Sequence, residues 1–134
     1  MEITLLVITS ALSLFAAFGF YKAGSFKARA SKQDLLDAGF GWMKNVPEAI
    51  GKLIGWLELA GALGLVVSPI AYFLSLEWAL WLAVAAAAGL ALTMLVAILM
   101  HAARNETKYT IKMTAPLFLV SVLIAAGWVS YLAI

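Results

Sequence analysis

The sequence predicts an all-α protein, a four-helix transmembrane bundle with a short interfacial amphipathic helix between helices 1 and 2. The chain is 65% hydrophobic and 12% charged, whereas soluble domains are about 45–50% apolar and roughly 25% charged. Four segments each reach the roughly 20 mostly apolar residues that a membrane helix requires. All nine lysines and arginines fall in or beside two of the three connections. We therefore expect residues 1–134 to form a single four-span membrane domain.

Charges, prolines and turn residues separate the four expected spans. The spans cover roughly residues 3–21, 49–67, 78–100 and 115–134. Pro47 suits the first turn of the second span and Pro116 the start of the fourth, because proline fits the first helical turn. Pro69 is expected to follow the end of the second span. The first span is expected to be a retained helix, because the N-terminus lacks the basic region of a signal peptide.

The distribution of basic residues predicts the orientation of the chain. Six of the nine lie in or beside the first connection and three lie in the third. Cytoplasmic loops of membrane proteins carry an excess of lysine and arginine. The sequence therefore predicts a multi-pass protein with both basic connections in the cytoplasm and both termini outside.

The first connection contains a candidate amphipathic helix. Ser31 and Asp34 have the spacing of a capping box. Charged residues alternate after them with an apolar set, which is Leu35, Leu36, Phe40, Trp42 and Met43. A helix of this composition lies in the headgroup region of a membrane. We expect it to anchor the connection, and a gate or docking surface is the alternative.

Glu58, near the middle of the second span, is the most informative residue of the chain. A charged carboxyl at bilayer depth costs roughly 2.5–3.5 kcal/mol to insert. Gly51, Gly55 and Gly61 share its helix face, and small residues mark the close approach of another helix. The same reasoning predicts that Gly89 packs against a neighbouring helix. We expect Glu58 to point into the bundle, either to bind a ligand or proton or as a hydrogen-bonded fastener.

Four further residues are candidates to form a ligand-binding site with Glu58. Ser13 and Thr93 lie near its depth, given a rise of about 1.5 Å per helical residue, and are candidate hydrogen-bond partners. Lys22 lies about 12 Å away along the membrane normal, which makes an ion pair marginal. We therefore expect Glu58 to be neutral and Lys22 to anchor the interface. His101 is expected to cap a helix C-terminus, with a proton-relay or ligand role as the alternative.

The composition excludes several kinds of chemistry. The chain has no cysteine, so disulfides, thiolate nucleophiles and cysteine-ligated metals are excluded. A single histidine is too few for a histidine-cluster metal site and a poor supply of haem ligands. The sequence shows no nucleophile–base pair and no phosphate loop. We therefore expect no catalytic residues and no metal, and an enzyme that uses only its own side chains is not expected.

Three segments carry a resemblance to a known family. They are Gly19-Phe-Tyr-Lys22, Ile54-Gly-Trp-Leu-Glu-Leu-Ala-Gly-Ala-Leu-Gly-Leu65 and His101-Ala-Ala-Arg-Asn-Glu106. Together with the order and spacing of the spans, they resemble the DoxX-like family of small bacterial membrane proteins. The resemblance implies a four-helix bundle in the bacterial cytoplasmic (inner) membrane and gives weight to Lys22, Glu58 and His101. It also implies links to quinol-dependent oxidation, redox-stress complexes or the assembly of membrane partners.

Three functions remain open from the sequence. The first is a non-enzymatic accessory or assembly subunit that binds a membrane partner or a lipid-like ligand in an intramembrane pocket around Glu58. The second is the membrane subunit of a quinone-linked oxidoreductase complex, so quinone and lipid are the only candidate cofactors. The third is proton-coupled transport of a small hydrophobic molecule, although the chain is short and shows no inverted broken helices. The candidate partners are the lipid bilayer, a membrane protein and a second copy of the chain, whereas nucleic acid is not expected.

Overall fold

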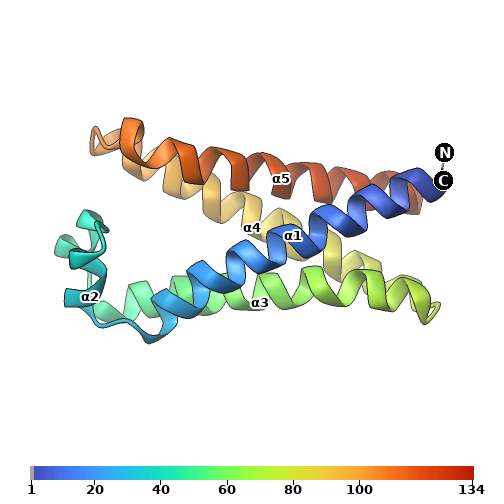
Figure 1. Cartoon of the computed structure of the whole chain (residues 1–134), viewed down its shortest axis with the longest axis horizontal. Helices are drawn as coiled ribbons and strands as arrows, with labels where there is room; N and C mark the ends of the chain where they lie inside the picture. The colour runs from blue at the N-terminus through green and yellow to red at the C-terminus, as the bar shows by residue number, and fades with distance from the viewer. Residues whose placement is uncertain (1) are drawn as a thin grey trace.

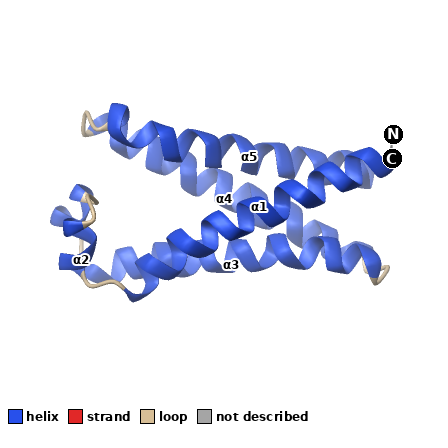
Figure 2. Cartoon of the chain, in the orientation of Figure 1, coloured by secondary structure: helices blue, strands red, loops and turns tan. Residues whose placement is uncertain are grey.

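Four long helices build the molecule in the computed structural model, which describes residues 2–134 apart from the side chains at 68, 77 and 109. The long helices are α1 (Glu2–Arg29), α3 (Glu48–Phe73), α4 (Glu77–Ala103) and α5 (Thr107–Ala133). The short helix α2 (Lys32–Asp37) and the 3-10 helix η1 (Gly41–Asn45) lie between α1 and α3 (Figure 1). Figure 2 shows helices and loops throughout the described residues. The predicted fold class is confirmed.

Each long helix is long and apolar enough to cross a membrane. Each also extends beyond the span expected from the sequence. The extension of α1 lies mainly at its C-terminal end, where the helix continues past Tyr21 to Arg29. Lysine and arginine side chains permit this extension, since their apolar stems can lie along a helix while the charged groups reach the headgroups. The extension adds about two turns to α1 and carries its last basic residues past the expected end of the span.

Two proline positions differ from the expectation. Pro69 lies inside α3 and does not follow its end. Pro116 lies inside α5, which already begins at Thr107. A proline removes one backbone donor from a helix, but transmembrane helices tolerate this where neighbouring groups satisfy the freed carbonyl. Pro47 is the residue that precedes α3, as its N-cap.

The long helices contact one another in the cyclic order α1, α3, α4, α5, so each packs between two antiparallel neighbours. The most extensive contacts join α1 to α3 and α4 to α5. Both chain termini lie together at one end of the bundle (Figure 1). The connection from α1 to α3 and the connection from α4 to α5 lie at the other end, which we call the basic end. The α1–α3 pair and the α4–α5 pair diverge toward the basic end (Figure 1).

Two glycines allow α1 and α3 to touch through their backbones. A Cβ atom at Gly24 would lie 2.8 Å from the carbonyl oxygen of Gly55, and a Cβ atom at Gly55 would collide with the backbone nitrogen of Ala28. A Cβ atom at Gly24 would also lie 3.0 Å from Glu58 Cβ, so Glu58 lies directly against Gly24. Lys27 lies one turn later than Gly24 on the same face of α1. The contact therefore brings Lys27 of α1 next to Glu58 of α3.

The small residues of α4 lie on two faces, and one of the two is unpacked. A Cβ atom at Gly89 would meet nothing within 4 Å, so the expectation that Gly89 packs against a helix is wrong. The packed face of α4 is formed instead by Ala83, Ala87, Leu90 and Met94. Because alanine and glycine recur on all sides of this helix, the spacing of small residues could not identify the buried face.

The first connection forms the predicted capping box. The backbone nitrogen of Asp34 donates to Ser31 Oγ at 3.1 Å, and the backbone nitrogen of Ser31 donates to the Asp34 carboxylate at 3.0 Å. These hydrogen bonds, chiefly the one from the Ser31 backbone, hold the pKa of Asp34 below its ordinary value. The expected single amphipathic helix is divided into α2 and η1 by a turn at Gly39, whose φ of +95° favours glycine.

The apolar side chains of this connection pack against α3. Leu35 and Met43 are fully buried. A Cβ atom at Gly51 of α3 would lie 2.9 Å from Leu35 and 3.1 Å from Met43, so the glycine leaves room for both. The connection is thus fixed on the bundle at the basic end.

Candidate functional site

Glu58 forms a buried ion pair with Lys27. The Lys27 ammonium donates a hydrogen bond to Glu58 Oε1 at 2.8 Å. The Glu58 side chain is 1% exposed and the Lys27 side chain is 12% exposed. The predicted burial of Glu58 inside the bundle is confirmed. The expectation that Glu58 lacks a cation is corrected, because the longer α1 and the contact between Gly24 and Gly55 bring Lys27 to it.

Lys22 lies away from this ion pair. Its side chain is exposed, and its ammonium lies 5.6 Å from the centroid of the Phe18 ring on the same helix. It does not line the pocket that adjoins Glu58. The structure therefore does not bring Lys22 and Glu58 together.

Ser13 does not hydrogen-bond to Glu58, which corrects the expectation. The Ser13 hydroxyl donates to the Thr9 carbonyl at 2.7 Å and accepts from the indole nitrogen of Trp128 at 3.2 Å. The bond from Trp128 joins α5 to α1 in the interior of the bundle. Ser13 therefore serves helix packing in this arrangement.

Thr93 does not hydrogen-bond to Glu58 either. Its hydroxyl donates to the carbonyl of Gly89, four residues earlier, at 2.9 Å. Its side chain does line the pocket next to Glu58. The structure thus places Thr93 near the site without the predicted contact.

The second carboxylate oxygen of Glu58 is a buried acceptor. Oε2 receives no hydrogen bond from any residue in the described range. A buried polar atom left unsatisfied costs roughly 1–3 kcal/mol, and more when the group is charged. Native proteins pair nearly all such atoms, so this oxygen is an exception within the described residues.

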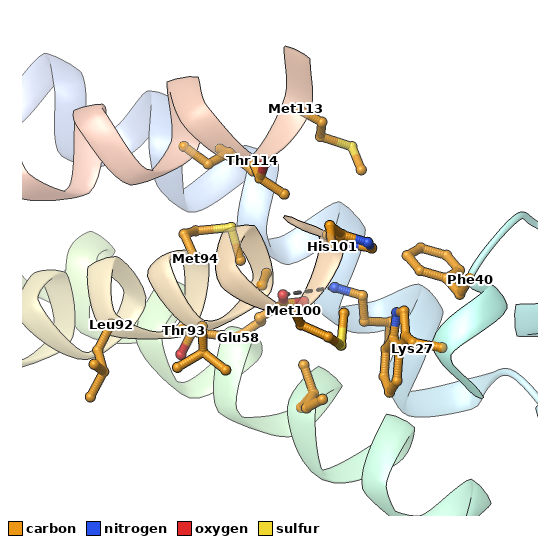
Figure 3. Close-up of a pocket in the computed structure, with 16 residues that line it drawn as sticks. Lys27, Phe40, Glu58, Leu92, Thr93, Met94, Met100, His101, Met113 and Thr114 are labelled. Atoms are coloured by element: carbon orange, nitrogen blue, oxygen red, sulfur yellow. Dashed lines mark hydrogen bonds and ion pairs between the residues drawn. The ribbon is translucent and has the colours of Figure 1, made fainter. Parts of the chain in front are cut away.

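A cavity of about 330 Å³ adjoins Glu58 where the two helix pairs diverge (Figure 3). All four long helices and the segment around η1 contribute to its walls. The walls are mainly aliphatic, aromatic and methionine side chains, and the polar ones are Lys27, Glu58, Thr93, His101 and Thr114. Ligand sites in proteins typically occupy about 300–1,000 Å³ and have apolar walls with a few placed polar groups.

The cavity opens through the side of the bundle. Leu92 and Val96 of α4 and Met113 of α5 line it and are themselves exposed. All three lie within the membrane-spanning parts of their helices. An exposed side chain at that depth faces acyl chains, so a molecule dissolved in the bilayer could enter from the side.

His101 links the cavity to a polar cluster at the basic end. His101 lines the cavity, and its Nδ1 lies 2.9 Å from Glu106 Oε2. Arg104 Nε donates to the other oxygen of Glu106, also at 2.9 Å. These bonds, chiefly the one from His101, hold the pKa of Glu106 below its ordinary value. His101 thus lies in the last turn of α4, as expected, and also borders the site.

Glu106→Gln is expected to weaken the acid dependence of stability. Because the pKa of Glu106 is lowered on folding, its ionised form stabilises the protein above the ordinary glutamate pKa. That contribution is lost as the pH falls through the lowered folded value. The melting temperature of the wild type, measured from neutral to acidic pH, should therefore fall more steeply than that of Glu106→Gln. Parallel pH profiles would contradict the role of this cluster.

Four membrane-length helices around a buried ion pair and an apolar cavity define an integral membrane protein with an intramembrane pocket. The chain belongs to the DoxX-like family, whose model matches residues 11–127. The matched range includes most of every long helix and contains Lys27, Glu58 and His101. The resemblance inferred from the three sequence segments is confirmed. No curated protein and no solved structure matched the chain in the same comparisons.

Proposed function

We propose that this protein is a non-enzymatic accessory subunit of the bacterial inner membrane that binds a lipid-like ligand in the cavity beside Glu58. The supporting observation is the buried pair of Lys27 and Glu58 at the wall of a largely apolar cavity. In such a cavity, apolar walls cover the body of a ligand and a few polar groups fix its orientation. Ionisable residues inside a membrane typically mark ligand or proton sites.

The charge distribution supports one orientation for this binding. By the positive-inside rule, the basic end would face the cytoplasm and both termini would lie outside. The pocket lies toward the basic end, so the ligand would enter from the inner leaflet. A membrane protein partner or a second copy of the chain would then receive or sense the bound ligand.

A quinone-linked membrane subunit is the second candidate. Lys27 lines the cavity and carries N–H donors suited to a quinone carbonyl, and His101 lines the cavity as well. His101 is bonded in turn to Glu106, which is partly exposed at the basic end. This chain of groups would let a proton pass between the cavity and water, while the redox centre would belong to a partner.

Filling the cavity tests the proposed function. Ala97 lines the cavity, and Ala88 on the same helix is exposed and does not line it. We expect wild type purified in native lipid, analysed by mass spectrometry, to retain a discrete lipid-like molecule. Ala97→Phe should lose this molecule and Ala88→Phe should keep it. A wild type without a retained ligand, or equal retention in both variants, would overturn the proposal.

A further inference from the structure

We infer that the apolar chain of the ligand lies in a second hollow, a groove between α3 and α4 that continues the cavity away from the basic end. The inference rests on the proposed binding function and assigns a further part of the same site. It follows from the position of the groove, from the side chains that line it and from the open space along α4. The ligand would thus be an amphiphile with a long apolar chain.

The α3–α4 groove is a hollow of about 390 Å³ on the outside of the bundle. Its walls include Leu57, Ala60 and Gly61 of α3 and Ala85, Gly89 and Thr93 of α4. Leu57, Ala85 and Gly89 are exposed. Both walls lie within membrane-spanning segments. The groove therefore faces the acyl chains of the bilayer.

The groove begins where the cavity ends. Thr93 lines both hollows. Residues four apart lie on the same face of a helix, and on α4 Ala97 follows Thr93 into the cavity while Gly89 precedes it in the groove. On α3, Glu58 lines the cavity and Gly61, nearly one turn later, lines the groove. The two hollows thus follow each other along both helices.

The side chains of the chain itself leave the groove open. A Cβ atom at Gly61 would lie 2.6 Å from Leu90, so α3 and α4 touch at this point. A Cβ atom at Gly89 would meet nothing within 4 Å. Apolar walls without neighbouring atoms lose dispersion contacts, and small residues in a membrane helix permit a close approach. An apolar chain suits this space, of which alanine at Gly89 would occupy one methyl group.

The combined length of cavity and groove favours a long chain. From His101 to Thr93 the cavity runs about 12 Å along α4, given a rise of about 1.5 Å per residue. From Thr93 to Ala85 the groove adds about 12 Å more. The hydrocarbon core of a bilayer is about 30 Å thick, so one leaflet contributes about 15 Å. A ligand whose polar end lies beside His101 would therefore extend its chain past the middle of the bilayer.

Two photoreactive probes test the inference on the whole wild-type protein in lipid nanodiscs. They are decanol and octadecanol, each with a diazirine near the free end of the chain, and peptide mass spectrometry locates the labelled residues. We expect decanol to label the cavity near Ala97 and octadecanol to label the groove between Ala85 and Gly89. Excess unlabelled octadecanol, still dilute in the lipid, should abolish the groove labelling, because a binding site saturates and the bulk bilayer does not.

Two variants with the same substitution test the position of the chain. Ala85 lines the end of the groove away from the cavity, whereas Ala88 is exposed and lines neither hollow. Ala85→Phe should abolish the labelling of the groove by octadecanol and leave the labelling of the cavity by decanol unchanged. Ala88→Phe should change neither.

The outcomes separate the inference from the proposed function. Octadecanol labelling spread evenly over the exposed helix faces, or groove labelling that does not saturate, overturns the inference, while decanol in the cavity would still support the proposed function. No saturable labelling by either probe overturns both. Wild-type dimers that Ala85→Phe dissociates would show that a second copy fills the groove, which also overturns the inference. The saturation experiment uses wild type alone, so a variant that fails to fold does not obscure it.

Discussion

Lys27→Met should destabilise the folded protein by about 3–5 kcal/mol, the usual cost of removing one partner from a buried ion pair. Glu58 would remain almost fully buried and lose its only described hydrogen bond. Methionine keeps most of the aliphatic stem of lysine, so packing at this position would change little. The free energy of unfolding in detergent, from denaturant titration followed by circular dichroism, measures the effect.

Two further variants isolate the charge from the packing. Lys22→Met is the matched control, because Lys22 is exposed and outside the cavity. It should change stability by less than about 0.5 kcal/mol, as is usual for surface substitutions. The double variant Lys27→Met with Glu58→Met should recover most of the loss, because it removes both buried charges. Equal losses in Lys27→Met and Lys22→Met would contradict the pairing of Lys27 with Glu58.

The fold was predictable because a bilayer imposes strict constraints on a sequence. The apolar composition and the four long apolar segments predict a helical bundle. In the bilayer core no water is present to bond the backbone, and a helix satisfies its own backbone N–H and C=O groups. The small residues around Glu58 also indicated correctly that its side chain turns inward. Composition and periodicity therefore sufficed for the architecture and for the burial of the central carboxyl group.

The partner of Glu58 was not predictable by the same reasoning. A lysine near the end of an apolar segment is usually an interfacial anchor, so Lys27 gave no distinct signal. Its pairing depends on the length of α1 and on the contact at Gly24 and Gly55. The available signal was Gly24, a small residue one turn before Lys27 on the same face of α1, which lets α3 approach closely there.

The hydroxyl groups were misassigned for a different physical reason. A serine or threonine in a helix can satisfy its own hydroxyl with the carbonyl four residues earlier. Ser13 and Thr93 both do so, with oxygen–oxygen distances of 2.7 and 2.9 Å. Depth in the membrane therefore predicts that such residues lie at the same level as Glu58. It does not predict that their hydroxyl groups are available to donate to Glu58. This local satisfaction leaves Glu58 Oε2 without a donor among them.

Gly55→Ala should separate α1 from α3 and lower stability by about 1–3 kcal/mol, the usual cost of overpacking a tight interface. The added Cβ atom would collide with the backbone nitrogen of Ala28 and lie 2.7 Å from the carbonyl oxygen of Gly24. Backbone atoms cannot move aside as a flexible side chain would, so the helices must move apart. That displacement would also lengthen the contact between Lys27 and Glu58. Denaturant titration measures the loss of stability, and mass spectrometry of the retained lipid-like molecule in the same preparation measures the effect on the site.

Gly89→Ala provides the matched control for Gly55→Ala, because it makes the same chemical change on a membrane-spanning helix. A Cβ atom at Gly89 has open space around it, and alanine favours a helix over glycine by roughly 0.5–1 kcal/mol. This variant should therefore be as stable as wild type or slightly more stable, with unchanged retention of the lipid-like molecule. If Gly55→Ala behaved in the same way, α1 and α3 would not be in backbone contact, and the placement of Lys27 beside Glu58 would lose its structural basis.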